Sequence, residues 1–118
     1  MPKFMILIYE TDATSGKLGP EKQKAVLDKY AEWNKSLRDK GVFTGSERLS
    51  SAGRVLRKAD QKLRIHDGPY AESKEVFGGY WAIEVGSFEE AVECCRKSPH
   101  LDYGGTLEIR EITTCPVN

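Results

Sequence analysis

The sequence predicts one α+β domain over residues 1–118, with elements in the order strand, helix, strand, hairpin, strand, helix, strand. Three observations support this order. Short apolar runs of strand length recur along the chain, two segments have apolar residues at helical spacing, and turn-forming residues separate them. Two strand–helix–strand units in succession are typical of a ferredoxin-like βαββαβ sandwich, which here carries an inserted hairpin.

The first predicted strand, residues 3–10, is apolar on both of its faces. Two sets of side chains alternate along it, namely Phe4, Ile6 and Ile8 against Met5, Leu7 and Tyr9. A strand that is apolar on both faces needs cover on both sides. Helices of the same chain can cover one side, so we expect a second copy of the chain, in a homodimer, to cover the other.

The first predicted helix begins at Pro20, which suits the first helical position, and ends before Gly41, a natural C-cap. Its apolar residues follow helical spacing: Val26, Tyr30, Trp33 and Leu37. We expect Tyr30 and Trp33 to lie in the core. Aromatic rings on a helix that packs on a sheet can also form the wall of a pocket, so Tyr30 is a candidate ligand-binding residue.

The middle of the chain predicts a strand over residues 42–49, with a bulge or close backbone approach at Gly45. A hairpin follows, with arms at residues 54–57 and 62–66 and a tip at residues 58–61. Leu63 and Ile65 alternate with polar residues, which predicts one buried face.

The C-terminal third predicts a central strand over residues 79–85 and a helix that begins with a capping box, Ser87 and Glu90. The pair Ser98-Pro99 ends this helix. Residues 100–105 are expected to form a loop, and residues 106–112 the last strand.

Composition excludes several classes of function. The 18 basic and 18 acidic residues balance, which argues against nucleic-acid binding. No apolar run approaches the roughly 18 residues of a membrane span. Three cysteines without a secretory signal pattern favour a reducing, cytoplasmic location. The adjacent pair Cys94-Cys95 lacks metal-ligand spacing, so we expect no metal site and no cofactor.

The segment from Ile65 to Lys74 is the first place to look for chemistry. Asp67-Gly68-Pro69 is a turn sequence in which Asp67 either bonds backbone N–H groups or shares in acid–base chemistry. His66 is either a solvated side chain or a group that titrates near neutral pH. Neighbours on a strand point to opposite faces, so His66 and Asp67 form a direct pair only if the turn begins there.

Further candidates lie on both sides of the second helix. Glu72 and Lys74 share one face of an extended segment, as a surface ion pair of little energetic worth or as a polar wall of a pocket. His100 follows a helix-ending proline in a predicted loop, and loops on rigid scaffolds often carry function. It is either structural or catalytic.

Several segments together resemble the YCII-related family, in the branch marked by an Asp-Gly-Pro-Phe motif. They are the apolar run of residues 4–9 and the segments 45–49, 67–75, 78–80, 99–100, 103–105 and 107–110. The resemblance covers essentially the whole chain. Tyr70 stands where the motif has Phe, and Ser73 stands where Thr is usual.

The resemblance implies a dimeric α+β barrel, in which two ferredoxin-like subunits join sheet to sheet. It also implies a possible enzyme, because an acid–base His–Asp pair is proposed in the wider family. Some relatives occur with, or fused to, sigma factors, which implies a regulatory alternative with a sigma factor as partner.

Three functions therefore remain open. The first is a cofactor-free enzyme that acts on a small molecule by His/carboxylate acid–base chemistry in a cleft. Its candidate catalytic residues are His66, Asp67 and His100, and its candidate ligand-binding residues are Tyr70, Glu72, Lys74 and Tyr30. The second is a non-catalytic ligand-binding or regulatory module, and the third is a purely structural dimer.

Overall fold

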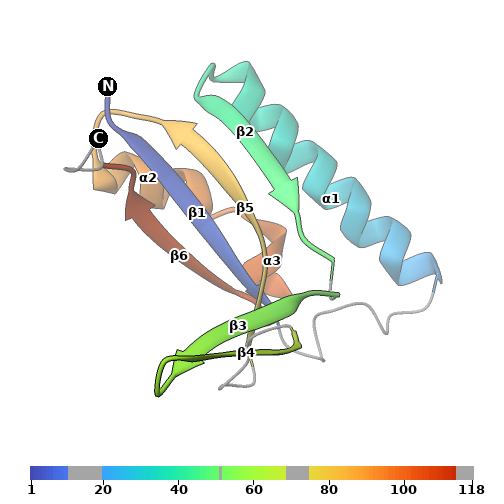
Figure 1. Ribbon diagram of the computed structural model, residues 1–118. Helices are drawn as coiled ribbons and strands as arrows, with labels where there is room; N and C mark the ends of the chain where they lie inside the picture. The colour runs from blue at the N-terminus through green and yellow to red at the C-terminus, as the bar shows by residue number, and fades with distance from the viewer. Residues whose placement is uncertain (11–19, 51, 69–74, 114–118) are drawn as a thin grey trace.

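The computed structural model describes residues 1–10, 20–50, 52–68 and 75–113 (Figure 1). Four strands form the main sheet: β1 (Lys3–Glu10), β2 (Phe43–Arg48), β5 (Val76–Glu84) and β6 (Thr106–Glu111). A separate hairpin consists of β3 (Arg54–Ala59) and β4 (Lys62–Asp67). The helices are α1 (Pro20–Asp39), α2 (Phe88–Cys95) and α3 (Pro99–Asp102).

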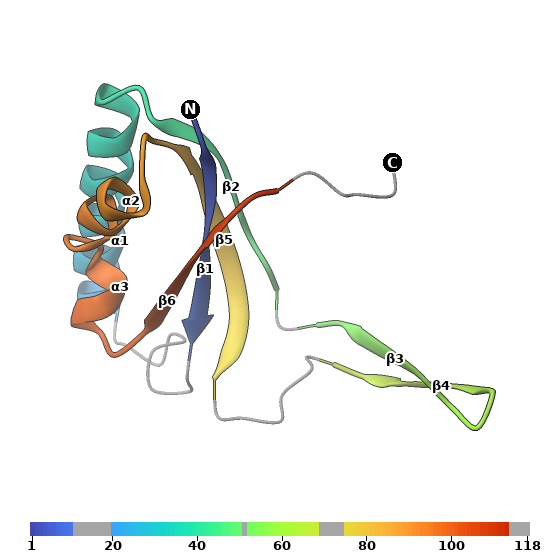
Figure 2. The same ribbon diagram turned by 90° about the vertical axis from the view of Figure 1, so that its left-hand side faces the viewer.

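The main sheet has the strand order β2-β5-β1-β6, and each neighbouring pair is antiparallel. The three helices all lie on one face of this sheet, as Figure 2 shows in side view. This order and layering confirm the predicted ferredoxin-like sandwich with an inserted hairpin. None of the helices in the described part of the chain is both long and apolar enough to cross a membrane.

The core lies between the sheet and the helices. Phe4, Ile6 and Ile8 of β1 are buried on this side, beside Ile83 and Trp81 of β5. The alternate β1 residues Met5, Leu7 and Tyr9 are only half-buried on the opposite face, which none of the three described helices covers. We call this second surface the open face. The period-2 alternation of β1 therefore divides its apolar side chains between a filled core and an uncovered surface.

Local signals in the sequence explain the ends of the helices. Helix α1 begins at Pro20, and Gly41 after its last turn has a φ of +71° and donates its N–H to the Arg38 carbonyl at 3.0 Å. At α2, the Glu90 N–H donates to Ser87 Oγ at 3.2 Å, and Glu90 accepts from the Gly86 N–H at 2.9 Å. These contacts confirm the predicted C-cap and N-cap.

The predicted irregularity at Gly45 is also confirmed. The register between β2 and β5 shifts between Phe43 and Gly45, because β2 carries an extra residue there. After the shift, Ser46 and Arg48 pair with Trp81 and Gly79 of β5. The bulge therefore determines which β2 side chains point toward the helices near the end of the strand.

Two predictions for the connecting segments are wrong. The predicted loop at residues 100–105 contains the short helix α3, because Ser98 Oγ accepts the His100 N–H at 3.3 Å and Pro99 occupies the first turn. The hairpin tip is also tighter than predicted. Only Asp60 and Gln61 connect β3 to β4, both with positive φ, as in a two-residue type I′ turn.

The predicted burial of one hairpin face is wrong within the single chain. Leu63 and Ile65 are each 60% exposed. Figure 2 shows the reason: the hairpin stands clear of the main sheet and projects from the side of the open face. No layer in the described part of the chain therefore covers the side chains that the alternation marks as apolar.

Candidate active site

A cavity of about 190 Å³ lies between the middle of α1 and the sheet. Its walls come from β1, α1, β2, β5 and α3, so it forms only when the whole domain is folded. Apolar walls are supplied by Ile8, Leu27 and Trp81. Polar and charged walls include Glu10, Tyr30, Asn34, Arg48 and His100.

Helix α3 places His100 at this cavity. The His100 residue is 5% exposed, and its backbone N–H is held by Ser98. Its ring packs directly on Gly105, where an added Cβ would lie 2.0 Å from His100 Cδ2 and 2.5 Å from Nε2. A side chain at position 105 therefore competes with the imidazole for the same space, and glycine is the residue that admits it.

His100 and Tyr30 form a hydrogen-bonded pair. The Tyr30 hydroxyl bonds His100 Nδ1, which joins α1 to α3 across 70 positions of sequence. The Tyr30 ring stacks on Trp81 with centroids 6.1 Å apart. Trp81 Nε1 in turn donates to Asn34 Oδ1 at 2.7 Å, which holds the indole in place. The Tyr30–His100 pair is thus held by packing and hydrogen bonds on more than one side.

Burial sets the charge states of this pair. It lowers the pKa of His100 from its usual 6.5, and Arg48 lowers it further, whereas Glu10 and the Tyr9 backbone act in the opposite direction. Burial also raises the pKa of Tyr30 well above its usual range, and Glu10 adds to this rise. At neutral pH the imidazole is therefore neutral and the phenol keeps its proton.

These charge states suit the geometry of the hydrogen bond. A protonated Tyr30 hydroxyl donates to an unprotonated Nδ1, which leaves the ring proton of neutral His100 on Nε2. Within the described residues, Nε2 is buried without a hydrogen-bond partner of normal geometry, and the Tyr9 backbone interacts with the imidazole more weakly. Buried polar atoms without a full partner are uncommon in folded proteins. The pair can accept a proton through Tyr30 and hold it as imidazolium.

The double glycine of β5 shapes the charged end of the cavity. An added Cβ at Gly78 would lie 2.9 Å from the Glu10 carboxylate. At Gly79, which has a φ of +155°, it would lie 2.7 Å from the Glu47 carbonyl. The two glycines therefore let the Glu10 side chain and strand β2 approach β5 closely.

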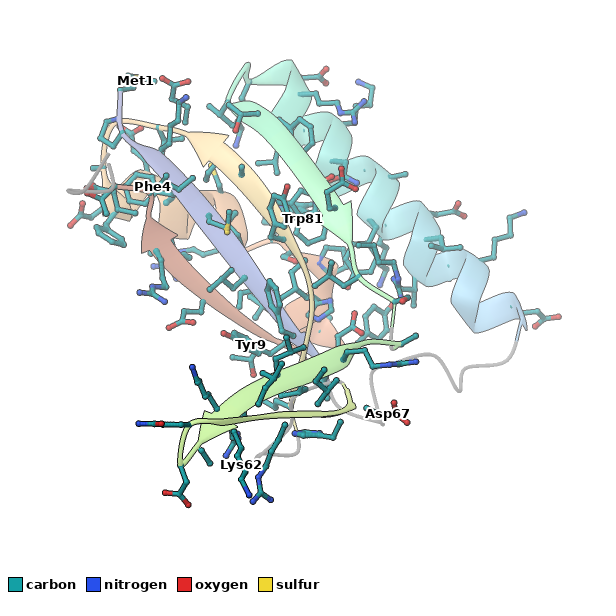
Figure 3. All side chains as sticks on the ribbon, viewed as in Figure 1. Met1, Phe4, Tyr9, Lys62, Asp67 and Trp81 are labelled. Carbon is teal, nitrogen blue, oxygen red and sulfur yellow. The ribbon has the colours of Figure 1, made fainter. Side chains whose placement is uncertain are left out.

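The structure brings together only some of the predicted site residues. His100 and Tyr30 meet at the cavity, whereas His66 and Asp67 lie on β4, exposed and outside its walls. Figure 3 shows Asp67 on the hairpin, well apart from Trp81. Asp67 forms an exposed ion pair with Arg54 at 3.4 Å, and His66 Nδ1 lies 3.1 Å from the Asp67 carbonyl oxygen. The predicted ligand-binding residues Tyr70, Glu72 and Lys74 lie outside the described residues.

Other cavity residues were not among the predicted ones. Glu10 and Arg48 are the last residues of β1 and β2, and both influence the pKa values of Tyr30 and His100. The sequence signal for Glu10 and Arg48 was weak, because each is a single charged residue at the end of a strand. For metal binding, the ranges that the structure describes hold no group of three or more His, Cys, Asp or Glu side chains placed to share an ion.

The depressed pKa of His100 predicts that acid destabilises the fold. Below pH 6.5 the unfolded chain takes up a proton at this position that the folded chain resists, so stability falls as pH drops. The loss of stability begins near pH 6.5 and is complete below the pKa of His100 in the folded chain. Thermal unfolding between about pH 7.5 and pH 5.5 measures it. The slope should be smaller in His100→Gln and unchanged in His66→Gln; equal slopes in wild type and His100→Gln would contradict the prediction.

Comparison with known proteins places the chain in a family. The family model described as the YCII-related domain matches residues 2–116. An uncharacterized protein of Rhizobium meliloti strain 1021 is 23% identical over 112 residues, which cover 92% of this chain and 90% of that protein. One similar solved structure is that of 5-chloro-2-hydroxyhydroquinone dehydrochlorinase from Burkholderia phenoliruptrix AC1100, in complex with 2,5-dihydroxybenzoquinone. Its sequence is 18% identical, the match covers 97% of this chain and 98% of that chain, and the TM-score is 0.49. Because the family model spans nearly its whole length, the chain belongs to the YCII-related domain family.

Proposed function

We propose that this protein is a small-molecule enzyme that uses the Tyr30–His100 pair for proton transfer without a cofactor. The observation that carries the proposal is a buried histidine, hydrogen-bonded to a half-buried tyrosine, at the wall of a cavity. Perturbed titratable groups that converge on a cavity are typical of active sites. Both residues were candidates from the sequence, but their pairing is a property of the fold.

The proposed step moves one proton from the substrate. The Tyr30 oxygen accepts the substrate proton as the hydroxyl proton passes to His100 Nδ1, which gives a neutral tyrosine and an imidazolium. Glu10, which raises the pKa of His100, stabilises this imidazolium. Arg48 lies at the same cavity and stabilises negative charge left on the substrate. The reverse transfer returns the proton to a different atom of the same molecule, and this completes an isomerisation.

The size and lining of the cavity restrict the substrate. At about 190 Å³ the cavity is smaller than the roughly 300–1,000 Å³ of sites for drug-sized ligands. The walls formed by Ile8, Leu27 and Trp81 suit an apolar body, and Arg48 suits a carbonyl or carboxylate oxygen. We therefore propose a small organic molecule with an acidic hydrogen next to such a group.

Deuterium exchange tests the proposed proton transfer before a physiological substrate is known. In D₂O we expect the protein to catalyse exchange at the acidic carbon of at least one small enolisable probe, such as pyruvate, 2-oxobutyrate or cyclohexane-1,3-dione. Proton NMR measures the rate. Tyr30→Phe and His100→Gln should each reduce it by about 10²–10⁴-fold, the usual worth of a general acid or base.

The pH profile and one further variant sharpen this test. Because His100 acts in its neutral form, the rate should fall as pH drops through the pKa of His100 in the folded chain, which burial holds below its usual 6.5. His66→Gln removes the exposed histidine of β4, and we expect it to retain the rate. Exchange that depends on His66 rather than His100, or no exchange with any of these probes, would contradict the proposal.

A ligand-binding module remains the second candidate, because the same cavity can hold a small molecule without chemistry. It predicts that a probe binds with similar affinity to wild type, Tyr30→Phe and His100→Gln, and that none of the three proteins catalyses exchange. A sigma factor as partner stays a prediction from the sequence resemblance.

We also propose that the protein acts as a homodimer joined through the open face. Met5, Leu7 and Tyr9 leave apolar surface there, next to Tyr80 and Ala82 of β5. Helices of the same chain cover the other side of the sheet. A sheet with both faces apolar is most stable when both are covered, and a second copy presents a matching surface.

A further inference from the structure

The β3–β4 hairpin has one apolar and one basic face. In an antiparallel pair, directly opposed residues share a face, and Leu56 opposes Ile65 while Lys58 opposes Leu63. Leu56, Leu63 and Ile65 therefore lie on one side, where they are 61%, 60% and 60% exposed, and they share this side with Lys58 and the Arg54–Asp67 ion pair. Three large apolar side chains on one strand pair form a patch rather than scattered exposure.

The opposite face of the hairpin is strongly basic. There Arg57 opposes Arg64 and Lys62 opposes Ala59. Residues 54–67 together hold five Lys or Arg and two Asp or Glu residues, whereas the rest of the chain holds thirteen and sixteen. The hairpin and the remainder thus carry opposite net charges of equal size. On the open face itself, Glu47, Glu84 and Glu108 stand against Lys3 and Arg110.

The hairpin extends away from its own domain. Figure 2 shows it projecting on the side of the open face, opposite the helices. The apolar side chains of the hairpin therefore receive no cover from the described part of their own chain.

We propose that the hairpin is an arm that packs its apolar face against a second copy of this chain. This role rests on the proposed dimer, because a copy seated on the open face would lie beside the projecting hairpin. An isolated two-stranded hairpin is at best marginally stable in water, so contact with a partner would stabilise this one. The net negative charge of the partner outside its own hairpin favours the approach of the basic arm.

The arm also enlarges the interface toward the usual size. A stable interface buries about 800 Å² on each partner, which three apolar side chains alone do not supply. The open face, with Met5, Leu7 and Tyr80, contributes the rest. Twofold symmetry makes the contact reciprocal, so each copy receives one arm and gives one.

Two matched double variants of β4 test the arm. The double substitution Leu63→Thr and Ile65→Thr removes the apolar face, whereas Lys62→Thr and Arg64→Thr changes the basic face of the same strand. Threonine keeps the strand propensity of the replaced positions. Sedimentation velocity over a concentration series measures dimer dissociation. We expect the first variant to weaken the dimer at least tenfold, and the second to change it less than threefold.

Further measurements keep the result decisive. Leu7→Glu on the open face should abolish the dimer. Comparison of this variant with the β4 variants separates the contribution of the open face to dimer formation from that of the hairpin. Hydrogen exchange of the wild-type chain should show residues 54–67 protected at high concentration and exposed on dilution, a result that depends on no variant folding. The deuterium-exchange assay with 2-oxobutyrate tests the proposed enzyme activity, and it does so independently of the dimer and of the arm.

Several outcomes would overturn the arm. If the wild-type chain stays monomeric at micromolar concentration, both the proposed dimer and the proposed arm are contradicted. In a second outcome, the dimer dissociates as in wild type in the Leu63→Thr, Ile65→Thr variant and yet is lost in Leu7→Glu. That result would support the dimer through the open face and contradict the proposed role of the hairpin as an arm. If Lys62→Thr with Arg64→Thr instead abolishes binding of a DNA duplex while dissociation is unaffected by either β4 variant, the hairpin is a nucleic-acid surface.

Discussion

Gly105→Ala should destabilise the fold by about 1–3 kcal/mol, the usual cost of overpacking a filled site. The new Cβ would lie 2.0 Å from His100 Cδ2, so the imidazole has to move. Moving it stretches or breaks the hydrogen bond between His100 Nδ1 and the Tyr30 hydroxyl. Urea unfolding measures the loss of stability, and the exchange assay should show a loss of rate comparable with that of His100→Gln.

Two comparisons isolate the contact between position 105 and the ring. Gly45→Ala adds a Cβ where nothing lies within 4 Å, so it should change stability little. In a double-mutant cycle, His100→Ala removes the ring, and Gly105→Ala should then cost much less than in the wild-type background. Additive effects of the two substitutions would show that Gly105 does not act through His100.

Leu37→Ala should cost about 2–5 kcal/mol of stability, the range for a fully buried leucine. Leu37 is 1% exposed and lies in the core between α1 and the sheet. Its loss leaves a cavity next to side chains that position the helix. Because α1 carries Tyr30, a loosened helix should also weaken the Tyr30–His100 contact, although Leu37 does not line the active-site cavity.

Leu27→Ala supplies the matched control for this prediction. It is the same substitution on the same helix, but Leu27 is 64% exposed at the cavity. It should cost less than about 1 kcal/mol, in keeping with substitutions away from the core. Urea unfolding of the two variants measures the difference; equal costs would mean that α1 packs on the sheet through another face.

The sequence predicted most of the fold because its local signals agree with one another. Gly41 ends α1 and Ser87 begins α2, since capping depends on residues that are close in the chain. The alternation of β1 marked both of its faces correctly as apolar. It could not show that its own helices would cover Phe4, Ile6 and Ile8 while leaving Leu7 uncovered, because that depends on where the helices pack.

The candidate site was harder to predict. The most distinctive motif contains His66 and Asp67, yet the structure places both on an exposed hairpin. His100 was a weaker candidate by sequence, in a predicted loop, and the short helix α3 turns it into the cavity. Its partner Tyr30 was expected in the core or at a pocket. Their pairing spans 70 positions, and no local rule connects residues so far apart.

The sequence by itself determined the α+β class, the order of the main elements and the apolar character of both faces of β1, but it placed the start of β5 three residues late and the end of α2 at Ser98-Pro99, where α3 begins. The properties that it determined follow from the spacing of apolar residues and from turn and cap residues, which act over a few positions. Only the tertiary structure decided that Tyr30, His100, Glu10 and Arg48 share one cavity, and that Leu63 and Ile65 remain exposed. Such properties depend on the packing of elements from distant parts of the chain, which local periodicity does not encode.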